Sequence, residues 1–258
     1  MTRLRATAPS EPPTPESMLQ KASLARTPLI RAKYARRGLS HRGALDRTTR
    51  TMLLRQLYLS HMEGRRFAEA LHIAEQMLEG AVMPDVARQD AARACLGLGD
   101  RDRAIYHLRV ASRVSPPARR AFHLWTLGSV LFLTGHHRAA AGALARAARW
   151  GTTDKPLYRA QLWLARRAAG ESVSDLVTVR ERLEEAPCGQ GYGQFVLGSL
   201  AFEQRDDPSA ERYLTAFVQR ATGGRVALEV ALAAEVAHAR LLLRRVRARR
   251  RKPKANRG

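Results

Sequence analysis

Residues that could act as acid, base or metal ligand are few in this chain, and their spacing does not suit catalysis. His136 and His137 are adjacent in a predicted turn, where two neighbouring imidazoles do not easily face one metal ion, and no third ligand is placed by the sequence. Acidic pairs at residues 184–185 and 206–207 fall at a predicted helix end and turn, where capping explains them. The chain has no phosphate-binding loop, nucleophile elbow or dinucleotide fingerprint. We therefore predict no enzymatic activity, no metal, no cofactor and no small-molecule substrate.

The two cysteines indicate structural positions. Cys95 falls on the buried face of a predicted helix, and Cys188 falls in a predicted loop. Small buried thiols are ordinary core residues. Two cysteines so placed predict neither a disulfide framework nor a metal site.

Basic residues are the next group with chemical potential, because the formal net charge is +22. Residues 1–44 hold nine Lys or Arg against two Glu, and residues 240–258 hold ten Lys or Arg and no acid, whereas the middle is only mildly basic. Such clusters attract phosphate in a salt-dependent way and also anionic membrane surfaces. The candidates at the C-terminal end are Arg244, Arg245, Arg247, Arg249, Arg250, Arg251, Lys252 and Lys254.

The elements that position these groups are predicted most clearly in the stretch 124–147. Its apolar and small residues follow helical spacing on either side of Gly135, which predicts two short amphipathic helices around a tight turn. Gly135 ends the first helix, since a left-handed C-terminal residue is easiest for glycine. Gly128 and Ala140 lack bulk where the two helix backbones come close.

The same spacing recurs about every 34 residues, with repeats that start near Thr51, Asp85, Ala121, Pro156 and Gly191. Each unit has small or large apolar residues at fixed offsets, a turn and often a closing proline. This pattern resembles the tetratricopeptide repeat (TPR) family over most of the chain. The resemblance implies an all-α fold, an α-solenoid of about five TPR-like helical hairpins with a capping helix at the C-terminal end.

The domain organisation follows from this assignment. We expect residues 1–48 to be a basic, largely disordered extension with short helical stretches, which either docks on the first repeat or serves as a basic amphipathic element for an acidic partner or membrane surface. Residues 49–225 would form the repeat array, 226–247 the capping helix and 248–258 a basic disordered tail. No long apolar run and no secretory signal are present, so we expect a cytoplasmic protein.

The resemblance also implies a binding surface. In TPR arrays the first helix of each repeat lines a concave groove, and the matching positions here are rich in aromatic residues, the usual anchors of peptide recognition. The alternative is that these rings pack against a neighbouring helix or under a terminal segment. The candidate groove residues are Arg55, Gln89, Arg93, Phe122, Trp125, Phe132, Tyr192, Phe195 and Phe202.

The TPR subclass that clamps a C-terminal carboxylate is not indicated, because only Arg55 of its matching positions could serve. We therefore predict a protein-protein interaction scaffold or adaptor in a bacterial assembly, with a peptide or amphipathic segment of another protein in the groove. The alternative is a nucleic-acid-associated protein whose basic ends bind the phosphate backbone. Binding of the basic ends to an anionic membrane surface is a further option.

Overall fold

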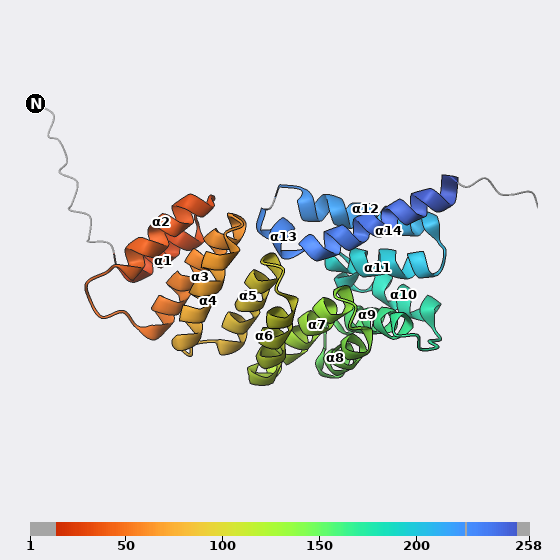
Figure 1. Ribbon diagram of the computed structural model, residues 1–258, viewed down its shortest axis with the longest axis horizontal. Helices are drawn as coiled ribbons and strands as arrows, with labels where there is room; N and C mark the ends of the chain where they lie inside the picture. Colours follow the sequence, from red (N-terminus) through yellow and green to blue (C-terminus); the bar gives the residue numbers. More distant parts are fainter. Residues whose placement is uncertain (1–13, 225, 252–258) are drawn as a thin grey trace, which may run out of the picture. The chain divides into compact units, whose positions relative to one another are not determined.

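The computed structural model describes residues 14–224 and 226–251 of the 258-residue chain (Figure 1). All regular structure in these residues is helical, which confirms the all-α prediction. The chain divides into two compact units, Met1–Val82 and Met83–Gly258. Each unit is built of antiparallel helical hairpins that follow one another in chain order, the construction of an α-solenoid.

The helices pair as the repeat spacing predicts. In the first unit they are α1 (Pro15–Ser23), α2 (Pro28–Leu39), α3 (Arg47–Glu63) and α4 (Phe67–Glu79). In the second unit they are α5 (Pro84–Gly97), α6 (Arg101–Val114), α7 (Pro117–Leu133), α8 (His137–Trp150), α9 (Lys155–Ala168), α10 (Leu176–Glu185), the short 3-10 helix η1 (Pro187–Gly189), α11 (Tyr192–Glu203), α12 (Asp207–Thr222), α13 (Val226–Ala231) and α14 (Ala233–Arg251).

In all five predicted hairpins, from α3/α4 to α11/α12, the second residue after the first helix has a left-handed backbone. These residues are Arg65, Gly99, Gly135, Gly170 and Arg205, so they recur at nearly the repeat period. Glycine adopts this conformation without steric cost. The two arginines hold it despite their Cβ atoms, with φ values of 55° and 59°. The turn geometry therefore repeats even where the glycine signal in the sequence is absent.

Close helix packing inside the hairpins explains two other glycines. A Cβ atom on Gly128 of α7 would lie 2.5 Å from Cγ of Leu144 in α8, and one on Gly198 of α11 would lie 2.6 Å from Cγ of Leu214 in α12. Both leucines are fully buried. The interpretation of Gly128 as a site of close helix approach is confirmed, and the same device recurs two repeats later.

The N-terminal segment is more ordered than the expectation of a largely disordered extension. Residues 15–39 form the hairpin α1/α2, which packs against α3 and buries Met18, Ala22, Ala32 and Ala35. Both helices begin at a threonine followed by proline, and each threonine side chain accepts a hydrogen bond from a backbone N–H of the first turn. Residues 1–13 lie outside the described residues.

The C-terminal segment also differs from the expected single cap over 226–247. It forms two helices, α13 and α14, and α14 continues to Arg251 instead of giving way to a tail at residue 248. Gly224, with φ of 95°, lies in the link that precedes them. Figure 1 shows α14 (dark blue) alongside α12 and over α11, and it also contacts α7. It therefore packs on several hairpins and not only on the last one.

Candidate partner-binding groove

Five of the predicted groove residues come together on the first helices of the third and fifth hairpins. Trp125 and Phe132 belong to α7, and Tyr192, Phe195 and Phe202 belong to α11. The ring centroids of Trp125 and Tyr192 are 4.9 Å apart, and those of Tyr192 and Phe195 are 5.6 Å apart. We call these five residues the aromatic strip. Their convergence could be predicted from repeat phasing, because α7 and α11 are equivalent helices two repeats apart.

The aromatic strip is covered by the chain's own helix α14. The imidazole of His238 lies 6.1 Å from the ring of Phe132 and 5.9 Å from the ring of Phe195, measured between centroids. The guanidinium of Arg249 lies 3.9 Å from the centroid of Phe202. As a result Phe195 is only 1% exposed. Of the two interpretations of these rings, packing under a terminal segment is the one seen in the structure.

A chain of polar contacts runs beneath α14. The indole Nε1 of Trp125 donates to Oε1 of Gln161 in α9 (2.6 Å), and Nε2 of Gln161 donates to the hydroxyl of Tyr192 (3.4 Å). That hydroxyl in turn donates to Oε1 of Glu235 in α14 (3.4 Å). Since each group uses the next as its partner, these contacts link α7, α9, α11 and α14.

Glu235 is the one carboxyl group of α14 that faces this surface, and it is buried. Burial raises its pKa to about 7, because a low-dielectric setting disfavours the charged form. The pKa of Tyr192 is raised well above its usual value, first by burial and then by the nearby Glu235 carboxyl. His238, also on α14, has its pKa lowered by burial and by Arg245. A neutral Glu235 and a neutral His238 are thus the forms that suit the docked helix.

Among the remaining predicted groove residues, Phe122 contacts the edge of the aromatic strip, with its ring centroid 5.7 Å from that of Trp125. Phe122, at the start of α7, stays 40% exposed. On α5, Gln89 is buried, whereas Arg93 is partly exposed and lies 3.9 Å from Asp90. Arg55 belongs to α3 in the other compact unit. The nine predicted residues therefore comprise the five covered rings on α7 and α11, the exposed Phe122 of α7, and three residues on α3 and α5.

Several of the cations predicted to bind anionic surfaces have acidic neighbours on α12. Arg247 and Arg250 both pair with Glu211, at 3.3 Å and 2.6 Å, and Arg249 pairs with Asp207 at 3.2 Å. Lys252 and Lys254 lie outside the described residues. Among the residues that the structure describes, no acidic partner is recorded for Arg244, Arg245 and Arg251 of α14.

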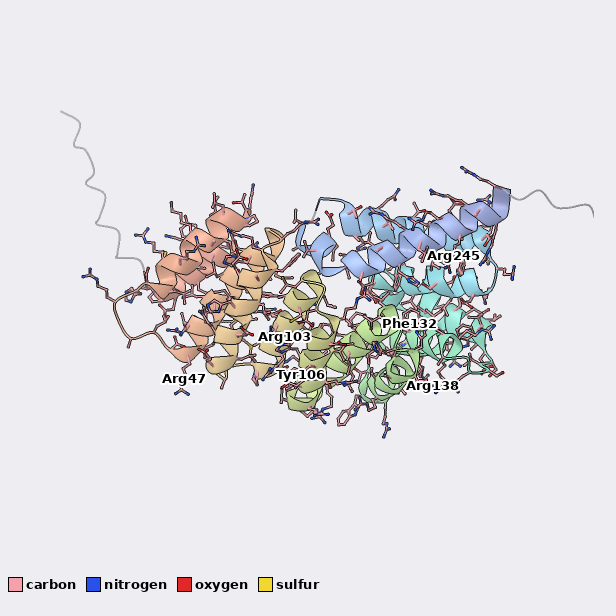
Figure 2. The ribbon with its side chains drawn as sticks, in the orientation of Figure 1. Arg47, Arg103, Tyr106, Phe132, Arg138 and Arg245 are labelled. Carbon is pink, nitrogen blue, oxygen red and sulfur yellow. The ribbon has the colours of Figure 1, made fainter. Side chains whose placement is uncertain are left out.

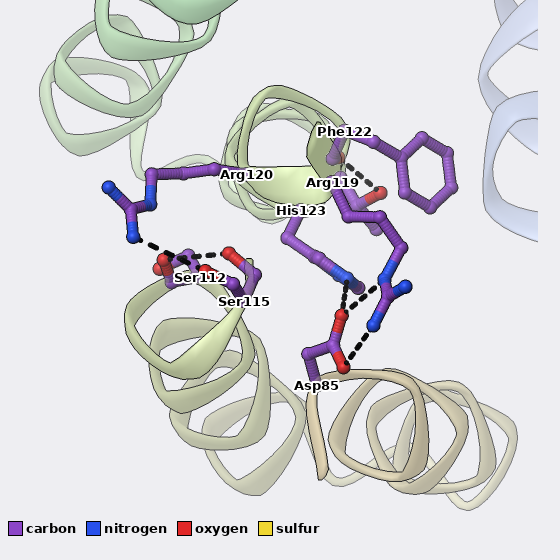
Figure 3. Close-up of polar contacts among 8 residues, drawn as sticks. Asp85, Ser112, Ser115, Arg119, Arg120, Phe122 and His123 are labelled. Carbon is purple, nitrogen blue, oxygen red and sulfur yellow. Dashed lines mark hydrogen bonds and ion pairs between the residues drawn. The ribbon is translucent and has the colours of Figure 1, made fainter. Parts of the chain in front are cut away.

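A buried carboxylate that sequence reasoning did not single out joins two hairpins. Asp85 of α5 accepts hydrogen bonds from Nε and Nη2 of Arg119, at 2.7 Å and 2.9 Å, and lies 3.0 Å from Nε2 of His123; both partners belong to α7 (Figure 3). Burial opposes ionisation of Asp85, but the hydrogen bonds outweigh it and lower its pKa. Burial also lowers the pKa of His123, which favours the neutral ring as donor to Asp85.

Asp85 and His123 resemble the carboxylate–histidine pair of a catalytic site, but the second ring nitrogen of His123 has no hydrogen-bond partner among the described residues. Nδ1 of His123 is buried, and the structure places no hydrogen-bond partner near it within the residues described. The hydrogen bonds of Asp85 thus link α5 of one repeat to α7 of the next. Asp85 and Arg119 are 34 residues apart, one repeat period, which is the signal that could have revealed the pair.

Neither a cluster of metal ligands nor a membrane-spanning helix is found in the part of the chain that the structure describes. Over 14–224 and 226–251, no three side chains of His, Cys, Asp or Glu come close enough together to hold a metal ion. None of the described helices combines the length and apolar character needed to cross a bilayer.

Comparison with known proteins finds no matching family model and no matching curated protein. Among solved structures, two crystal structures of the nearly identical TPR-like repeats of a putative kinesin light chain from Podosopora anserina are similar. They share 15% and 16% identity and TM-scores of 0.45 and 0.42, and the matches cover 80% of this chain and 96% and 98% of theirs. The TPR domain of P58(IPK) matches at 12% identity and a TM-score of 0.32, over 94% of this chain and 80% of that one. All three are TPR or TPR-like repeat proteins, the family that the sequence resembles.

Proposed function

We propose that the protein is a protein-protein interaction scaffold whose aromatic strip binds an amphipathic helix, and that α14 occupies this site until a partner replaces it. The observation that supports the proposal is the position of α14 on the neighbouring helices. It lies on the helices α7 and α11, which supply the predicted groove residues, and it contacts three rings of the aromatic strip, those of Phe132, Phe195 and Phe202. A surface that holds one amphipathic helix has the shape and apolar character to hold another.

The contacts of α14 define what such a partner must offer. Val236, Leu242, Leu243 and Val246 are buried along one face of the helix, while the opposite face is rich in exposed arginine. Each fully buried aliphatic side chain contributes roughly 1.5–3 kcal/mol. A partner segment would therefore carry aliphatic residues at the same helical spacing, with a neutral polar side chain where Glu235 meets Tyr192.

The covalent link between α14 and the rest of the chain determines how tightly a partner must bind to replace it. Because α14 is joined to the same chain through α13, its effective concentration at the aromatic strip is on the order of millimolar. A partner in trans must overcome this competition or bind when α14 has opened. The basal state would be closed, and any change that weakens α14 docking would raise the affinity for partners.

A peptide in trans tests this proposal. The probe is a fluorescein-labelled peptide of residues 226–251, and the proteins are the full chain and an opened variant with Leu242→Asp and Val246→Asp. Because the two aspartates disfavour the chain's own docked helix, we expect the opened variant to bind the peptide at least tenfold more tightly than the unchanged chain in fluorescence anisotropy. Adding Phe132→Ala to the opened variant should weaken that binding again.

The matched control is Val177→Asp, which makes the same kind of change at an exposed site on α10. Equal peptide binding by the opened variant and this control would contradict the proposal. Should the opened variant aggregate, amide hydrogen exchange of the unchanged chain decides the matter. A saturating amount of unlabelled peptide should speed exchange in α14, and no change in α14 would count against the proposal.

The alternative of nucleic-acid or membrane binding through the basic ends stays a prediction. Three arginines of α14 form ion pairs with Asp207 or Glu211. These pairs lower the number of α14 cations that are free to contact phosphate. We also propose, from the sequence, a cytoplasmic bacterial setting with no catalytic role for the chain.

A further inference from the structure

Charge is concentrated in the middle of the second unit as well as at the chain ends. Residues 101–150, which span α6 to α8, contain nine arginines and one acidic residue, Asp102. The middle of the chain is mildly basic only when its charge is averaged, because acidic residues in the segments before and after 101–150 offset the arginines of that stretch. Of these arginines, Arg119 is paired with the buried Asp85 of α5.

A small cavity lies within this basic region, between α6 and α8 with α7 beneath. Its volume is about 210 Å³. Leu127 and Leu131 of α7 and two alanines of α8 form an apolar floor. The rim carries Arg109 and Arg113 from α6 and Arg146 from α8. We call this site the α6–α8 furrow.

Helical spacing extends the furrow beyond the cavity. On α6, Tyr106 shares a face with Arg109 and Arg113, three and seven residues further on, and its ring is 56% exposed. On α8, Trp150 follows Arg146 on the face that lines the cavity, and it is 47% exposed. Exposed aromatic side chains thus accompany the arginines on both helices; Figure 2 labels Tyr106.

One end of the furrow is fixed by Arg120. Its guanidinium lies 4.7 Å from the centroid of the Trp150 ring and donates to the carbonyl oxygen of Ser115 (3.3 Å). Figure 3 shows Arg120 and Arg119 on opposite sides of α7, so one arginine serves the Asp85 cluster and the other faces the end of α6. The cation and ring are therefore held in place before any ligand arrives.

The chemistry of the furrow selects its ligand. The structure records no ion pair for Arg109, Arg113 or Arg146 with any described residue, and guanidinium groups bind carboxylates through paired hydrogen bonds. The cavity is smaller than the roughly 300–1,000 Å³ typical of cofactor and drug-sized ligand pockets, so it has room for one anchoring side chain. An apolar floor beneath a cationic rim matches carboxylates placed on either side of an apolar residue.

From these observations we propose that the α6–α8 furrow binds an acidic peptide segment of another protein, which inserts one large apolar side chain into the cavity. Single-stranded nucleic acid fits less well. It needs a run of free aromatic faces for successive bases, whereas the floor is aliphatic and one face of Trp150 is taken by Arg120. The furrow shares no residue with the aromatic strip, so the proposal does not depend on the function of α14.

The test uses the full chain and three labelled probes of similar net charge at 150 mM NaCl. The first is a twelve-residue peptide of Asp and Glu with one central Phe, the second has Ser in place of Phe, and the third is a single-stranded oligothymidylate. We expect the Phe peptide to bind at least fivefold more tightly than the Ser peptide and more tightly than the oligonucleotide. Fluorescence anisotropy measures all three affinities.

Variants then assign the binding to the furrow. Arg113→Glu with Arg146→Glu should weaken the Phe peptide at least tenfold, while Arg138→Glu, a charge reversal on α8 outside the cavity lining, should change it less than twofold. Ala139→Leu adds bulk to the cavity lining from an exposed position, so it should abolish the preference for Phe and leave the Ser peptide unaffected.

Three results would each overturn the proposal. These are equal binding of the Phe and Ser peptides by the unchanged chain, binding that resists the double charge reversal, and tighter binding of the oligonucleotide through the same arginines. The last result would assign the furrow to nucleic acid instead.

Discussion

Replacing Glu235 by glutamine should stabilise the docked form of α14, and more so at high pH. Burial raises the pKa of this carboxyl to about 7. The groups that face it are the hydroxyl of Tyr192 from α11 and the charge of Arg93 from α5, and His238 lies on the same helix. Glutamine keeps the shape of the side chain and its acceptor oxygen for Tyr192, but it cannot ionise.

The magnitude follows from linkage between protonation and docking. In the undocked helix the carboxyl has its ordinary pKa of 4.5, so a raised docked value means that docking is favoured at low pH and weakened as pH rises from 4.5 to about 7. Each pH unit in this window removes about 1.4 kcal/mol, and the loss levels off at roughly 3 kcal/mol. Between pH 5.5 and 8.5 the glutamine variant should therefore gain about 2 kcal/mol relative to the unchanged chain.

Amide hydrogen exchange of α14 at the two pH values measures this quantity, because it reports the free energy of local opening. His238 acts in the opposite direction, since its lowered pKa weakens docking as pH falls below 6.5. That effect is present in both proteins and cancels in the comparison. Glu181→Gln on the exposed face of α10 is the matched control. A benefit of Glu235→Gln that is the same at pH 5.5 and 8.5 would refute the reasoning.

Three further predictions concern stability, each measured by urea unfolding. Gly128→Ala should lower the unfolding free energy by about 1–3 kcal/mol, because its Cβ would lie 2.5 Å from Cγ of Leu144, and adding Leu144→Ala should make the two effects clearly non-additive. Asp85→Asn should lower it by about 1–3 kcal/mol by leaving Arg119 and His123 without their carboxylate, and the unchanged chain should lose this contribution as pH falls below about 4, because the folded pKa of Asp85 lies below 3.8. Glu211→Gln should change it by less than about 1 kcal/mol, because its partners Arg247 and Arg250 are largely exposed; a larger loss would show that these ion pairs hold α14 down.

The repeat array could be predicted because its signals are local. Small residues at fixed offsets, such as Gly128 and Ala140, report the close approach of two helices within about twenty residues of sequence. The left-handed turn at Gly135 is likewise specified by one residue type. Such signals recur with the period of the fold, so each repeat supports the assignment of the next.

The position of α14 could not be predicted in the same way. Its apolar face is visible in the spacing of Val236, Leu243 and Val246, but that spacing says only that one face is buried. Which surface it covers depends on the path of the chain after Gly224 and on long-range contacts with rings such as Phe132. Repeat phasing placed five aromatic residues on the equivalent helices α7 and α11, whereas local patterns could not show whether these rings form an open groove or are covered by another segment.

The α6–α8 furrow was missed for a different reason. Averaging charge over the whole middle of the chain conceals a stretch with nine arginines and one acid. The cavity beneath the arginines is made by side chains from three helices, and only the fold brings Leu127 of α7, Ala143 of α8 and Arg109 of α6 together. Counting charge over shorter segments of the sequence would have revealed the basic stretch, but not the apolar cavity between the helices.

The long reach of α14 has a consequence for synthesis on the ribosome. Most contacts in a repeat array join neighbours in sequence, so each hairpin can fold soon after it emerges. The contact between Phe132 and His238, however, spans 106 residues. During translation the aromatic strip must remain uncovered until α14 has been made and can pack against it. The nascent protein would thus present its apolar surface to chaperones or partners for longer than the finished protein does.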